Sequence, residues 1–382
     1  MTNRRKFLRV IGGGVIVAAV GTTAWALTRD PSTARQPWAD AGQTSNDPRR
    51  RALSYAILAP NPHNRQPWLA DLSVDGEITL HCQLDRRLEH TDPYDRQITI
   101  GLGAFIELLR MAAAEDGFET EIDLFPNGAP YPRLDERPVA RIRFVVGSKP
   151  EPDILFAHAL DRRTNRNSHD MTKPVAVDTI NAIARAARTS LVGHAVEPGA
   201  VGILRDLTWK AMFVELTTRD AWKESIDLTR IGKAEIDANP DGVSLSGPFL
   251  EGLYRLNLLS KAEMLDKESA GFRQMLPTMK APFDQTTAFM WLKTPGNSRK
   301  EQINAGRDYI RINLAATGQG VAMQPLSQAL QEFTEMEPLY AALHAALGAQ
   351  GPERVQMLTR IGYAAPVKPS PRWPFESRIV KT

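Results

Sequence analysis

The segment from Ala59 to Trp68, APNPHNRQPW, has the composition of a rigid loop that could hold a polar ligand. Proline has no amide hydrogen and restricts the residue before it, so three prolines in ten residues exclude the interior of a helix or strand. The amide side chains of Asn61, Asn64 and Gln66 can each donate and accept hydrogen bonds. We therefore expect the prolines to hold these amides in place for a ligand.

A second segment, LDRRTNRNSHD, has the make-up of a phosphate clamp, because Arg162, Arg163 and Arg166 surround Thr164. Guanidinium groups bind phosphate oxygens through paired hydrogen bonds, and a threonine hydroxyl adds a neutral one. The alternative for three arginines in five residues is an exposed surface or an ion-pair network.

The C-terminal tail, GYAAPVKPSPRWP, is a third basic segment, with Lys368, Ser370 and Arg372 among prolines. Zinc spacing of cysteine and histidine is absent from the sequence, so no metal site is predicted. The single cysteine, Cys82, excludes an intramolecular disulfide. His63 could act as a general acid, or it could be a residue with satisfied hydrogen bonds.

Two long segments that resemble each other predict the elements that position these residues. ITIGLGAFIELLRMAAAEDGF and EQINAGRDYIRINLAATGQGV align without a gap, which pairs Ile100 with Ile303 and Gly103 with Gly306. Both have apolar residues at helical spacing and small residues on one face. We expect two helices that pack together at the centre of a pseudo-symmetric body, although chance similarity is the alternative.

The remaining pattern predicts an α+β fold of two fused halves, residues 49–150 and 151–382. Strands are expected in ADLSVDGEITLHCQL, in ARIRFVVG and near Met357 to Tyr363. A helical insertion over 198–295 has no counterpart in the first half. Its methionines and aromatic residues are typical of a lid over a site, and a structural decoration is the alternative.

The N-terminus has the pattern of an export signal over residues 1–26, followed by a polar linker over 27–48. Arg4 and Arg5 precede an apolar run, which resembles a twin-arginine motif. We expect the twin-arginine translocase as a partner, a periplasmic or extracytoplasmic location, and no stable membrane insertion once the signal is cleaved; an uncleaved anchor is the alternative. The signal contains four of the 47 basic residues, so 43 remain against 44 acidic ones and nothing favours a nucleic-acid partner.

Together these segments resemble the nitroreductase superfamily of FMN enzymes, and more closely its exported and Acg-like members. The likeness lies in the loop of the type Ala-Pro-Ser-x-x-Asn-x-Gln-Pro-Trp, the Arg-Arg-Thr-x-Arg clamp and the basic tail. It implies a nitroreductase-like pseudo-dimer in one chain, with one FMN held between the loop of the first half and the clamp of the second. Ser370 stands where many members have lysine, and Asn61 and Pro62 replace small hydroxyl residues.

The resemblance also implies which residues contact the cofactor. The cofactor-binding residues predicted in the loop are Pro60, Asn61, Pro62, His63, Asn64 and Gln66; those in the clamp and the tail are Arg162, Arg163, Thr164, Arg166, Ser370 and Arg372. Pro325, Leu326, Ser327 and Gln328 are expected to present backbone amides near the reactive flavin nitrogen. No catalytic side chain is implied, because the flavin itself carries the hydride.

Two functions of different classes follow. The first is a flavin-dependent two-electron reduction of a small nitro, quinone or other conjugated substrate, with an electron donor that the sequence does not identify. The second is a non-catalytic protein that sequesters or stores flavin.

Overall fold

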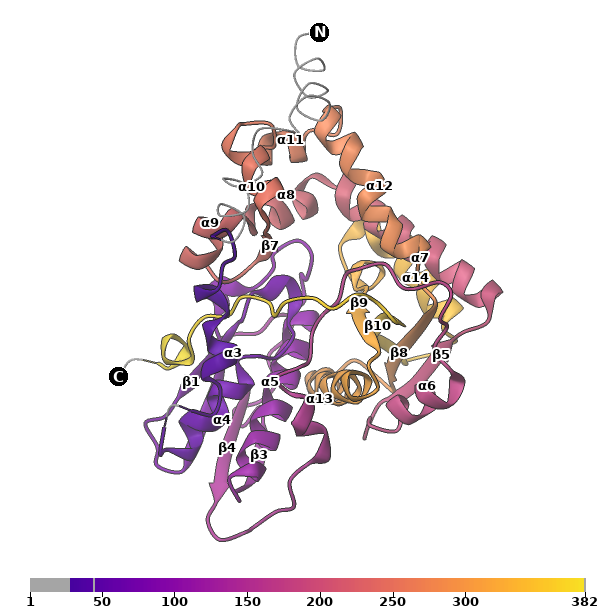
Figure 1. The fold of residues 1–382 in the computed structure, drawn as a ribbon. Helices are drawn as coiled ribbons and strands as arrows, with labels where there is room; N and C mark the ends of the chain where they lie inside the picture. Colours follow the sequence, from indigo (N-terminus) through magenta and orange to yellow (C-terminus); the bar gives the residue numbers. More distant parts are fainter. Residues whose placement is uncertain (1–27, 44, 381–382) are drawn as a thin grey trace.

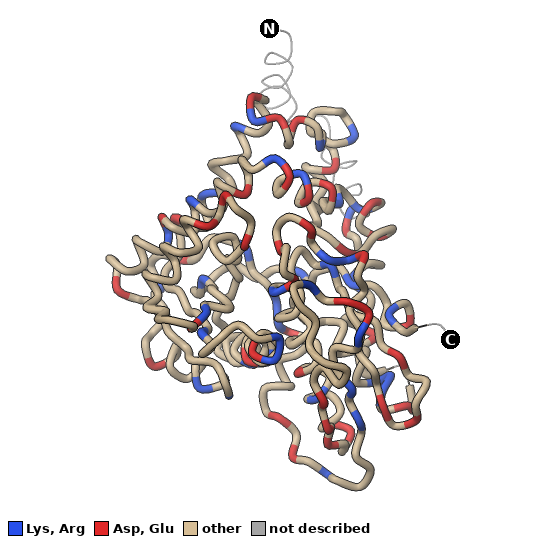
Figure 2. Tube along the Cα trace, turned by 180° about the vertical axis from the view of Figure 1, so that it is seen from behind, with Lys and Arg blue, Asp and Glu red and all other residues tan. Residues whose placement is uncertain are grey.

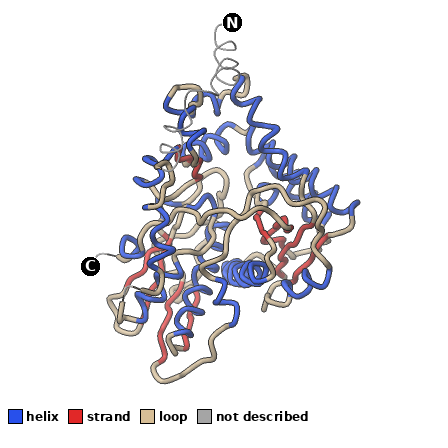
Figure 3. Tube along the Cα trace, viewed as in Figure 1, coloured by secondary structure: helices blue, strands red, loops and turns tan. Residues whose placement is uncertain are grey.

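The computed structural model describes residues 28–43 and 45–380, which form two four-stranded sheets and the helices packed on them (Figures 1 and 3). The first sheet contains β1 (Trp68–Asp71), β2 (Glu77–Cys82), β3 (Glu119–Leu124) and β4 (Ala140–Val145) in the order β1-β2-β4-β3. The second contains β5 (Leu191–Ala195), β8 (Ala288–Thr294), β9 (Ala322–Pro325) and β10 (Arg354–Gly362) in the order β5-β8-β10-β9. The predicted α+β class is confirmed.

The two sheets have the same strand order when their strands are matched along the chain. Every neighbouring pair in both sheets is antiparallel. The third and fourth strands follow α5 (Arg96–Glu115) in the first half and α13 (Arg299–Gly318) in the second. This order is the arrangement that the aligned helical segments predict.

α5 and α13 lie against each other at the centre of the molecule, so their predicted pairing is confirmed (Figure 1). A Cβ on Gly103 would lie 2.1 Å from the Ile303 carbonyl oxygen, and one on Gly306 would lie 1.9 Å from that of Ile100. The contact is reciprocal, as at a two-fold axis, since the residues that align also exchange places. Among the described residues α5 alone has the length and apolar composition to cross a membrane, and it is packed inside the protein.

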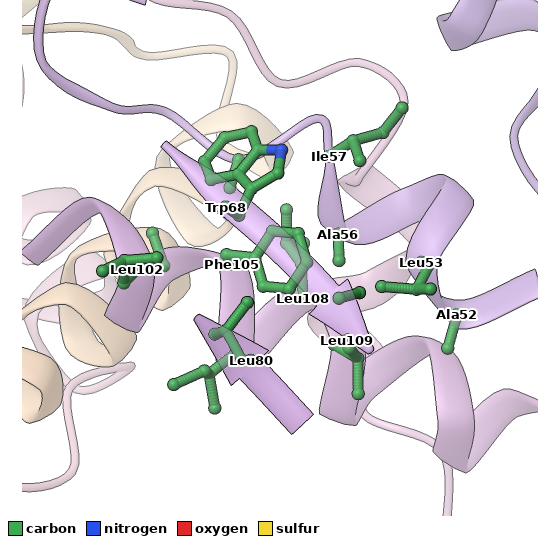
Figure 4. Packing of buried hydrophobic residues seen from close by; sticks show 14 of the residues in the cluster. Ala52, Leu53, Ala56, Ile57, Trp68, Leu80, Leu102, Phe105, Leu108 and Leu109 are labelled. Atoms are coloured by element: carbon green, nitrogen blue, oxygen red, sulfur yellow. The ribbon is translucent and has the colours of Figure 1, made fainter. Parts of the chain in front are cut away.

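The first sheet packs on α5 and α4 (Pro48–Ala56) through a core that includes Trp68, Phe105 and Leu80 (Figure 4). The rings of Trp68 and Phe105 are 5.0 Å apart. α4 begins at the N-cap Asp47, whose carboxylate accepts from the Arg49 amide, and has proline at its first position. Because α4 packs in this core, the core fixes its C-terminal end, where the predicted binding loop begins.

The second sheet is covered on both faces. One core joins it to α7 (Pro198–Thr217) and α14 (Glu337–Ala346), and another joins it to α6 (Val177–Ala184) and α13. Short 3₁₀ helices connect the larger elements: η2 (Pro62–Asn64), η3 (Leu84–Arg86), η4 (Ile154–His158), η5 (Gln328–Leu330), η6 (Thr334–Met336) and η7 (Phe375–Arg378).

The stretch inserted into the second half runs from the end of β5 to the start of β8, where the first sheet has only a short hairpin between β1 and β2. Its predicted end at residue 295 lies too far along the chain, because β8 is an interior strand. Beyond α7 it contains α8 (Arg219–Asp227), β6 (Thr229–Ile231), α9 (Gly232–Ala238), β7 (Val243–Leu245), α10 (Pro248–Arg255), α11 (Lys261–Leu265) and α12 (Ala270–Asp284). Trp222, Ile226, Met264 and Phe272 form a small core within it.

The described part of the predicted linker is a folded segment, which corrects the prediction over 27–48. It contains η1 (Thr33–Arg35) and α3 (Gln36–Asp40) and lies beside the C-terminal tail (Figure 1). Ala34, Trp38 and Ala41 are buried, so apolar burial rather than polar composition decides the structure here. The predicted signal over 1–26 lies outside the described residues.

Candidate functional site

Two arginines from the second half cap the C-terminal end of α4 in the first half. Arg372 donates to the carbonyl oxygens of Ile57 at 2.8 Å, Leu58 at 3.1 Å and Ala59 at 2.9 Å. Arg162 donates to the Leu58 carbonyl at 3.0 Å. The last carbonyls of a helix are unpaired and carry partial negative charge, so guanidinium groups are suited to this position. The tail residue Arg372 is thus bonded directly to the predicted loop, and the clamp residue Arg162 is bonded to the residue just before it.

The loop that follows α4 is held in an unusual backbone conformation. His63, Asn64 and Gln66 have φ angles of 46°, 51° and 52°, in the left-handed region that costs a residue with a side chain about 1 kcal/mol. Such conformations persist only where surrounding contacts hold them, and they concentrate at functional sites. Gly101 of α5 lets the loop approach closely, since a Cβ there would lie 3.0 Å from the Asn61 Cβ.

The loop's amide side chains supply those contacts, which differs from the role expected for them. The Asn61 side chain accepts from the Gln66 amide at 2.7 Å. Asn64 accepts from Arg372 at 2.6 Å and donates to the Pro371 carbonyl at 3.0 Å. Gln66, which is fully buried, accepts from the Trp373 amide at 2.9 Å and donates to the Pro240 carbonyl at 2.8 Å. These three amides tie the loop to the C-terminal tail and to the inserted stretch.

Arg162, Arg163 and Arg372, called here the arginine cluster, surround the indole of Trp38. Their guanidinium carbons lie 5.6, 4.7 and 5.7 Å from the ring centroid. Burial lowers the pKa of all three, and for Arg372 the charges of the other two arginines lower it further. None of the three makes an ion pair within residues 28–43 and 45–380. Buried positive charges without a carboxylate are costly, so the site suits an anion.

The tail and the clamp loop complete the surroundings of the cluster. Ser370 accepts from Arg372 through its hydroxyl at 3.0 Å and from the Trp38 indole through its carbonyl at 2.8 Å. Arg163 donates only to the carbonyls of Leu160, at 2.6 Å, and Arg162, at 2.8 Å. The Thr164 hydroxyl makes no hydrogen bond within the part of the chain that the structure describes. Arg163 and Thr164 thus keep hydrogen-bonding capacity for a ligand.

Several buried polar atoms around the site have no hydrogen-bond partner. They are His63 Nδ1, Arg162 Nε, the Tyr309 hydroxyl, Gln328 Oε1, Gln331 Oε1 and Trp373 Nε1. Buried polar atoms in proteins are nearly always paired, so the unpaired atoms of the loop residue His63 and the clamp residue Arg162 leave capacity for a polar ligand. The donor and acceptor atoms that are left over fit a ligand with a phosphate and several further polar groups.

Arg166 is not part of the arginine cluster. Its side chain is exposed, yet desolvation lowers its pKa. The negative charge of Glu215 in α7 acts in the opposite direction and raises the pKa. His63 has the same opposing partner: burial lowers its pKa, and Glu215 raises it. The negative charge of Glu215 in α7 therefore acts on both Arg166 and His63.

The turn after β9 supplies only part of what was expected of it. Pro325 has no amide hydrogen, and the Leu326 amide donates to the Leu358 carbonyl at 2.8 Å within the sheet. This corrects the expectation for these two residues and leaves the amides of Ser327 and Gln328 as candidates. Gln331, which was not predicted, donates to Glu215 at 2.8 Å and joins this turn to α7.

Other residues of the site escaped the sequence analysis because their roles depend on distant contacts. Arg360 of β10 is fully buried and donates to the carbonyls of Asn167 at 2.7 Å, Asn165 at 3.4 Å and Pro282 at 3.3 Å. It holds the clamp loop against the sheet and the end of α12. The sequence signal that could have identified Arg360 is an arginine among the apolar residues of a predicted strand. Trp38 and Asn313, which accepts from Arg162 at 3.2 Å, gave no comparable signal.

Comparisons with known proteins agree with the sequence resemblance. No protein family model matches the chain. The chain is similar to two Mycobacterium tuberculosis proteins, named "Putative NAD(P)H nitroreductase Rv3131" and "Putative NAD(P)H nitroreductase acg". The first is 26% identical over 343 residues, which cover 86% of this chain and 92% of the relative. The second is 26% identical over 339 residues, which cover 86% and 93%.

Solved structures also match, at lower identity. A nitroreductase from Bacteroides fragilis with bound FMN is 13% identical, with a TM-score of 0.33 over 56% of this chain and 89% of its own. A nitroreductase-like protein from Anabaena variabilis is 10% identical, with a TM-score of 0.39 over 76% of this chain and 69% of its own. The two sequence relatives align over most of both chains, so the similarity extends across both halves of this chain.

Proposed function

We propose that the chain is an exported flavoprotein that binds one FMN between its two halves and carries out a two-electron reduction of a nitro, quinone or other conjugated small molecule. The observation that carries the proposal is the arginine cluster, in which two buried guanidinium groups and the half-buried one of Arg163 gather beside the strained loop without an ion pair among the described residues. A phosphate group would neutralise the cluster. The 26% identical relatives named as NAD(P)H nitroreductases support the same function.

Each part of the site has a role in this proposal. Arg163, Thr164 and the unpaired Nε of Arg162 would hold the phosphate, and Arg372, whose donors bind protein oxygens, would add positive charge. The unpaired atoms of His63 and Gln328 would meet polar groups of the ring system and its chain. When bound, FMN supplies the hydride chemistry. The protein contributes position, charge and exclusion of water, so no side chain of this chain is required as an essential acid or base.

Export is proposed from Arg4 and Arg5 and the apolar run that follows them. The twin-arginine pathway carries folded proteins, so a cofactor could be loaded before export. Fractionation of cells with and without the twin-arginine translocase, with the chain followed by immunoblot, tests this part separately.

Binding of FMN by the wild-type protein is the primary test. Apo-protein produced without residues 1–26 is expected to quench FMN fluorescence with a stoichiometry of one.

The variant Arg163→Gln is expected to weaken binding about tenfold or more, because a charge-assisted hydrogen bond to phosphate contributes roughly 1.5–3 kcal/mol. Arg163 suits this test since its guanidinium donates only to two carbonyls. Arg143→Gln, which removes an exposed arginine paired with Glu121, is the matched control and should bind as the wild type does. Absence of FMN binding by the wild type would refute the proposal.

A flavin-sequestering protein is the second candidate, and one observation favours it. The inserted stretch is hydrogen-bonded directly to the loop, from Gln66 to the Pro240 carbonyl at 2.8 Å and from the Gly242 amide to the Asn64 carbonyl at 3.3 Å. A cover fixed in this way would limit access to the ring. Anaerobic titration of the FMN-loaded protein with NADPH and with a water-soluble quinol distinguishes the two, since a storage protein would be reduced by neither.

A further inference from the structure

The segment that precedes the first half reaches the anion site and closes it. The Ala34 carbonyl accepts from the Arg372 amide at 2.8 Å, Arg35 donates to the Pro369 carbonyl at 2.8 Å, and the Trp38 indole donates to the Ser370 carbonyl at 2.8 Å. These bonds run along the same stretch of the C-terminal tail. Trp38 is thereby held from one side while its ring faces the arginine cluster.

The indole of Trp38 is the one group among the described residues that all three guanidiniums of the arginine cluster approach through a ring face. An aromatic face carries negative electrostatic potential and attracts a guanidinium by about 0.5–2 kcal/mol, more when water is excluded. Trp38 is buried, and Arg162 and Arg372 are almost completely so. The ring therefore offsets part of the repulsion among three like charges that lack carboxylate partners.

We propose that Trp38 is a positioning residue for the cofactor's phosphate. Its ring holds Arg162, Arg163 and Arg372 in one arrangement, and its bond to Ser370 brings the C-terminal tail into that arrangement. The inference rests on the proposed function, because it takes the ligand of the arginine cluster to be the phosphate of FMN. It adds a residue from outside both halves to the determinants of phosphate recognition.

The physical consequence is a specificity for the phosphorylated cofactor. FMN and riboflavin share the ring system and differ in the phosphate, so a residue that acts through the arginine cluster changes their affinities unequally. Loss of the aromatic face loosens the guanidiniums in the protein without ligand, and more free energy is then needed to order them around a phosphate. Riboflavin has no phosphate, so its affinity does not depend on how the guanidinium groups are ordered.

The test compares equilibrium binding of FMN and riboflavin by flavin fluorescence in full-length mature protein. Trp38→Leu keeps an apolar side chain in the buried position and removes the aromatic face. It is expected to weaken FMN binding about tenfold and to leave riboflavin binding within about twofold of wild type, which corresponds to roughly 1.4 kcal/mol on FMN alone. Trp38→Phe keeps a smaller ring and should have an FMN affinity between those of wild type and Trp38→Leu.

The control variant is Trp209→Leu, which removes an indole of α7 that packs edge-to-face against Phe283 with centroids 5.5 Å apart, outside the arginine cluster. It should preserve the ratio of the two affinities. A Trp38→Leu variant with the wild-type ratio would overturn the inference. A gain of FMN affinity would overturn it too, because the indole would then be competing with the phosphate.

Failure of the proposed function gives a different result. A wild-type protein that binds neither flavin refutes the FMN proposal while the role of Trp38 can still be measured with inorganic phosphate. In that case phosphate should raise the melting temperature of wild type more than that of Trp38→Leu, and equal shifts would overturn the inference. If Trp38→Leu does not fold, the ratio of FMN affinity to riboflavin affinity is measured on Trp38→Phe. Its smaller ring should lower that ratio by less than the loss expected for Trp38→Leu, and an unchanged ratio would contradict the inference.

Discussion

Asn64 shows at the residue scale how a side chain that the sequence assigns to a ligand can instead hold the site's own backbone. Its amide bonds to Arg372 and to the Pro371 carbonyl while its φ of 51° lies in the left-handed region. Both features connect the loop of the first half to the tail of the second. A residue in this position combines two separable contributions to stability, one from hydrogen bonds and one from backbone conformation.

Substitution of Asn64 can separate these contributions. Asn64→Gly removes the hydrogen bonds and tolerates the positive φ, so we expect a loss of about 2 kcal/mol in the free energy of unfolding. Asn64→Ala removes the bonds and adds backbone strain, for a further loss of about 1 kcal/mol. Urea unfolding followed by circular dichroism measures both. Asn257, exposed and with a φ of 52°, is the control at which Ala should destabilise and Gly should not. Equal stability of the two Asn64 variants would show that the backbone conformation is not costly there.

The sequence predicted the positions of some charged residues of the site correctly, but not of all. Arg162, Arg163 and the tail residue Arg372 were predicted together, because the resemblance to the nitroreductase superfamily assigned all three to the phosphate. Arg166 was grouped with them by spacing in the chain, but among the described residues it does not approach the Trp38 ring as the other three do. Spacing along an irregular loop does not determine direction, since each residue there has its own backbone angles.

At the scale of elements, the pairing of α5 and α13 was the most predictable feature of the fold. Glycines and alanines on one helix face permit close approach, and this property can be recognised without a structure. The lengths of strands in the second half were less predictable. β8 reads as an apolar run that could end an inserted helix, and only its pairing with β5 and β10 makes it an interior strand. Pairing partners far apart in the chain leave no local signal.

The close approach of these helices can be tested at Gly103 and Gly306. A Cβ at Gly103 would lie 2.1 Å from the Ile303 carbonyl oxygen and one at Gly306 1.9 Å from that of Ile100, and backbone cannot move aside as a flexible side chain could. Gly103→Ala and Gly306→Ala are therefore expected to lower stability by more than about 3 kcal/mol or to prevent folding. Thermal unfolding and soluble yield measure this.

Gly202 provides the matched control, because it lies within α7 and a Cβ there meets no atom within 4 Å. Gly202→Ala should be neutral or stabilising by up to about 1 kcal/mol, since alanine favours the helix. Wild-type stability in both interface variants would contradict the packing of α5 on α13 as described.

At the scale of the whole molecule, the two halves depend on segments that cross between them. The C-terminal tail leaves the second sheet and runs past α3 of the N-terminal segment to the first half (Figure 1). The inserted stretch is anchored to the first half in turn: Glu224 of α8 accepts from the amides of Glu89 at 2.6 Å and Thr91 at 3.0 Å. The sequence predicted two halves and an insertion, but no local pattern reveals these crossings.

Lys and Arg residues are interspersed with Asp and Glu residues along the chain trace (Figure 2). One group of charged residues joins the halves inside the protein. Glu107 of α5 accepts from Arg307 at 2.9 Å and Arg311 at 3.1 Å, both in α13, and from Arg110 at 2.8 Å. Burial alone would raise the pKa of Glu107, but Arg110 and then Arg307 outweigh burial and lower it to about 2.

This pKa shift makes the junction between the halves sensitive to acid. A carboxyl group whose pKa is lower in the folded than in the unfolded state stabilises the fold above its unfolded pKa of about 4.5, and this contribution is lost as the pH falls toward 2. The shift corresponds to about 3 kcal/mol at neutral pH.

Glu107→Gln should lose about that much stability at pH 7. Its free energy of unfolding should also fall less steeply between about pH 4.5 and 2 than that of the wild type. Urea unfolding at pH 7, 4 and 3 measures both. Glu121→Gln, which breaks an exposed pair with Arg143, should change neither value. An acid decline in Glu107→Gln as steep as in the wild type would mean that other carboxyl groups govern the junction.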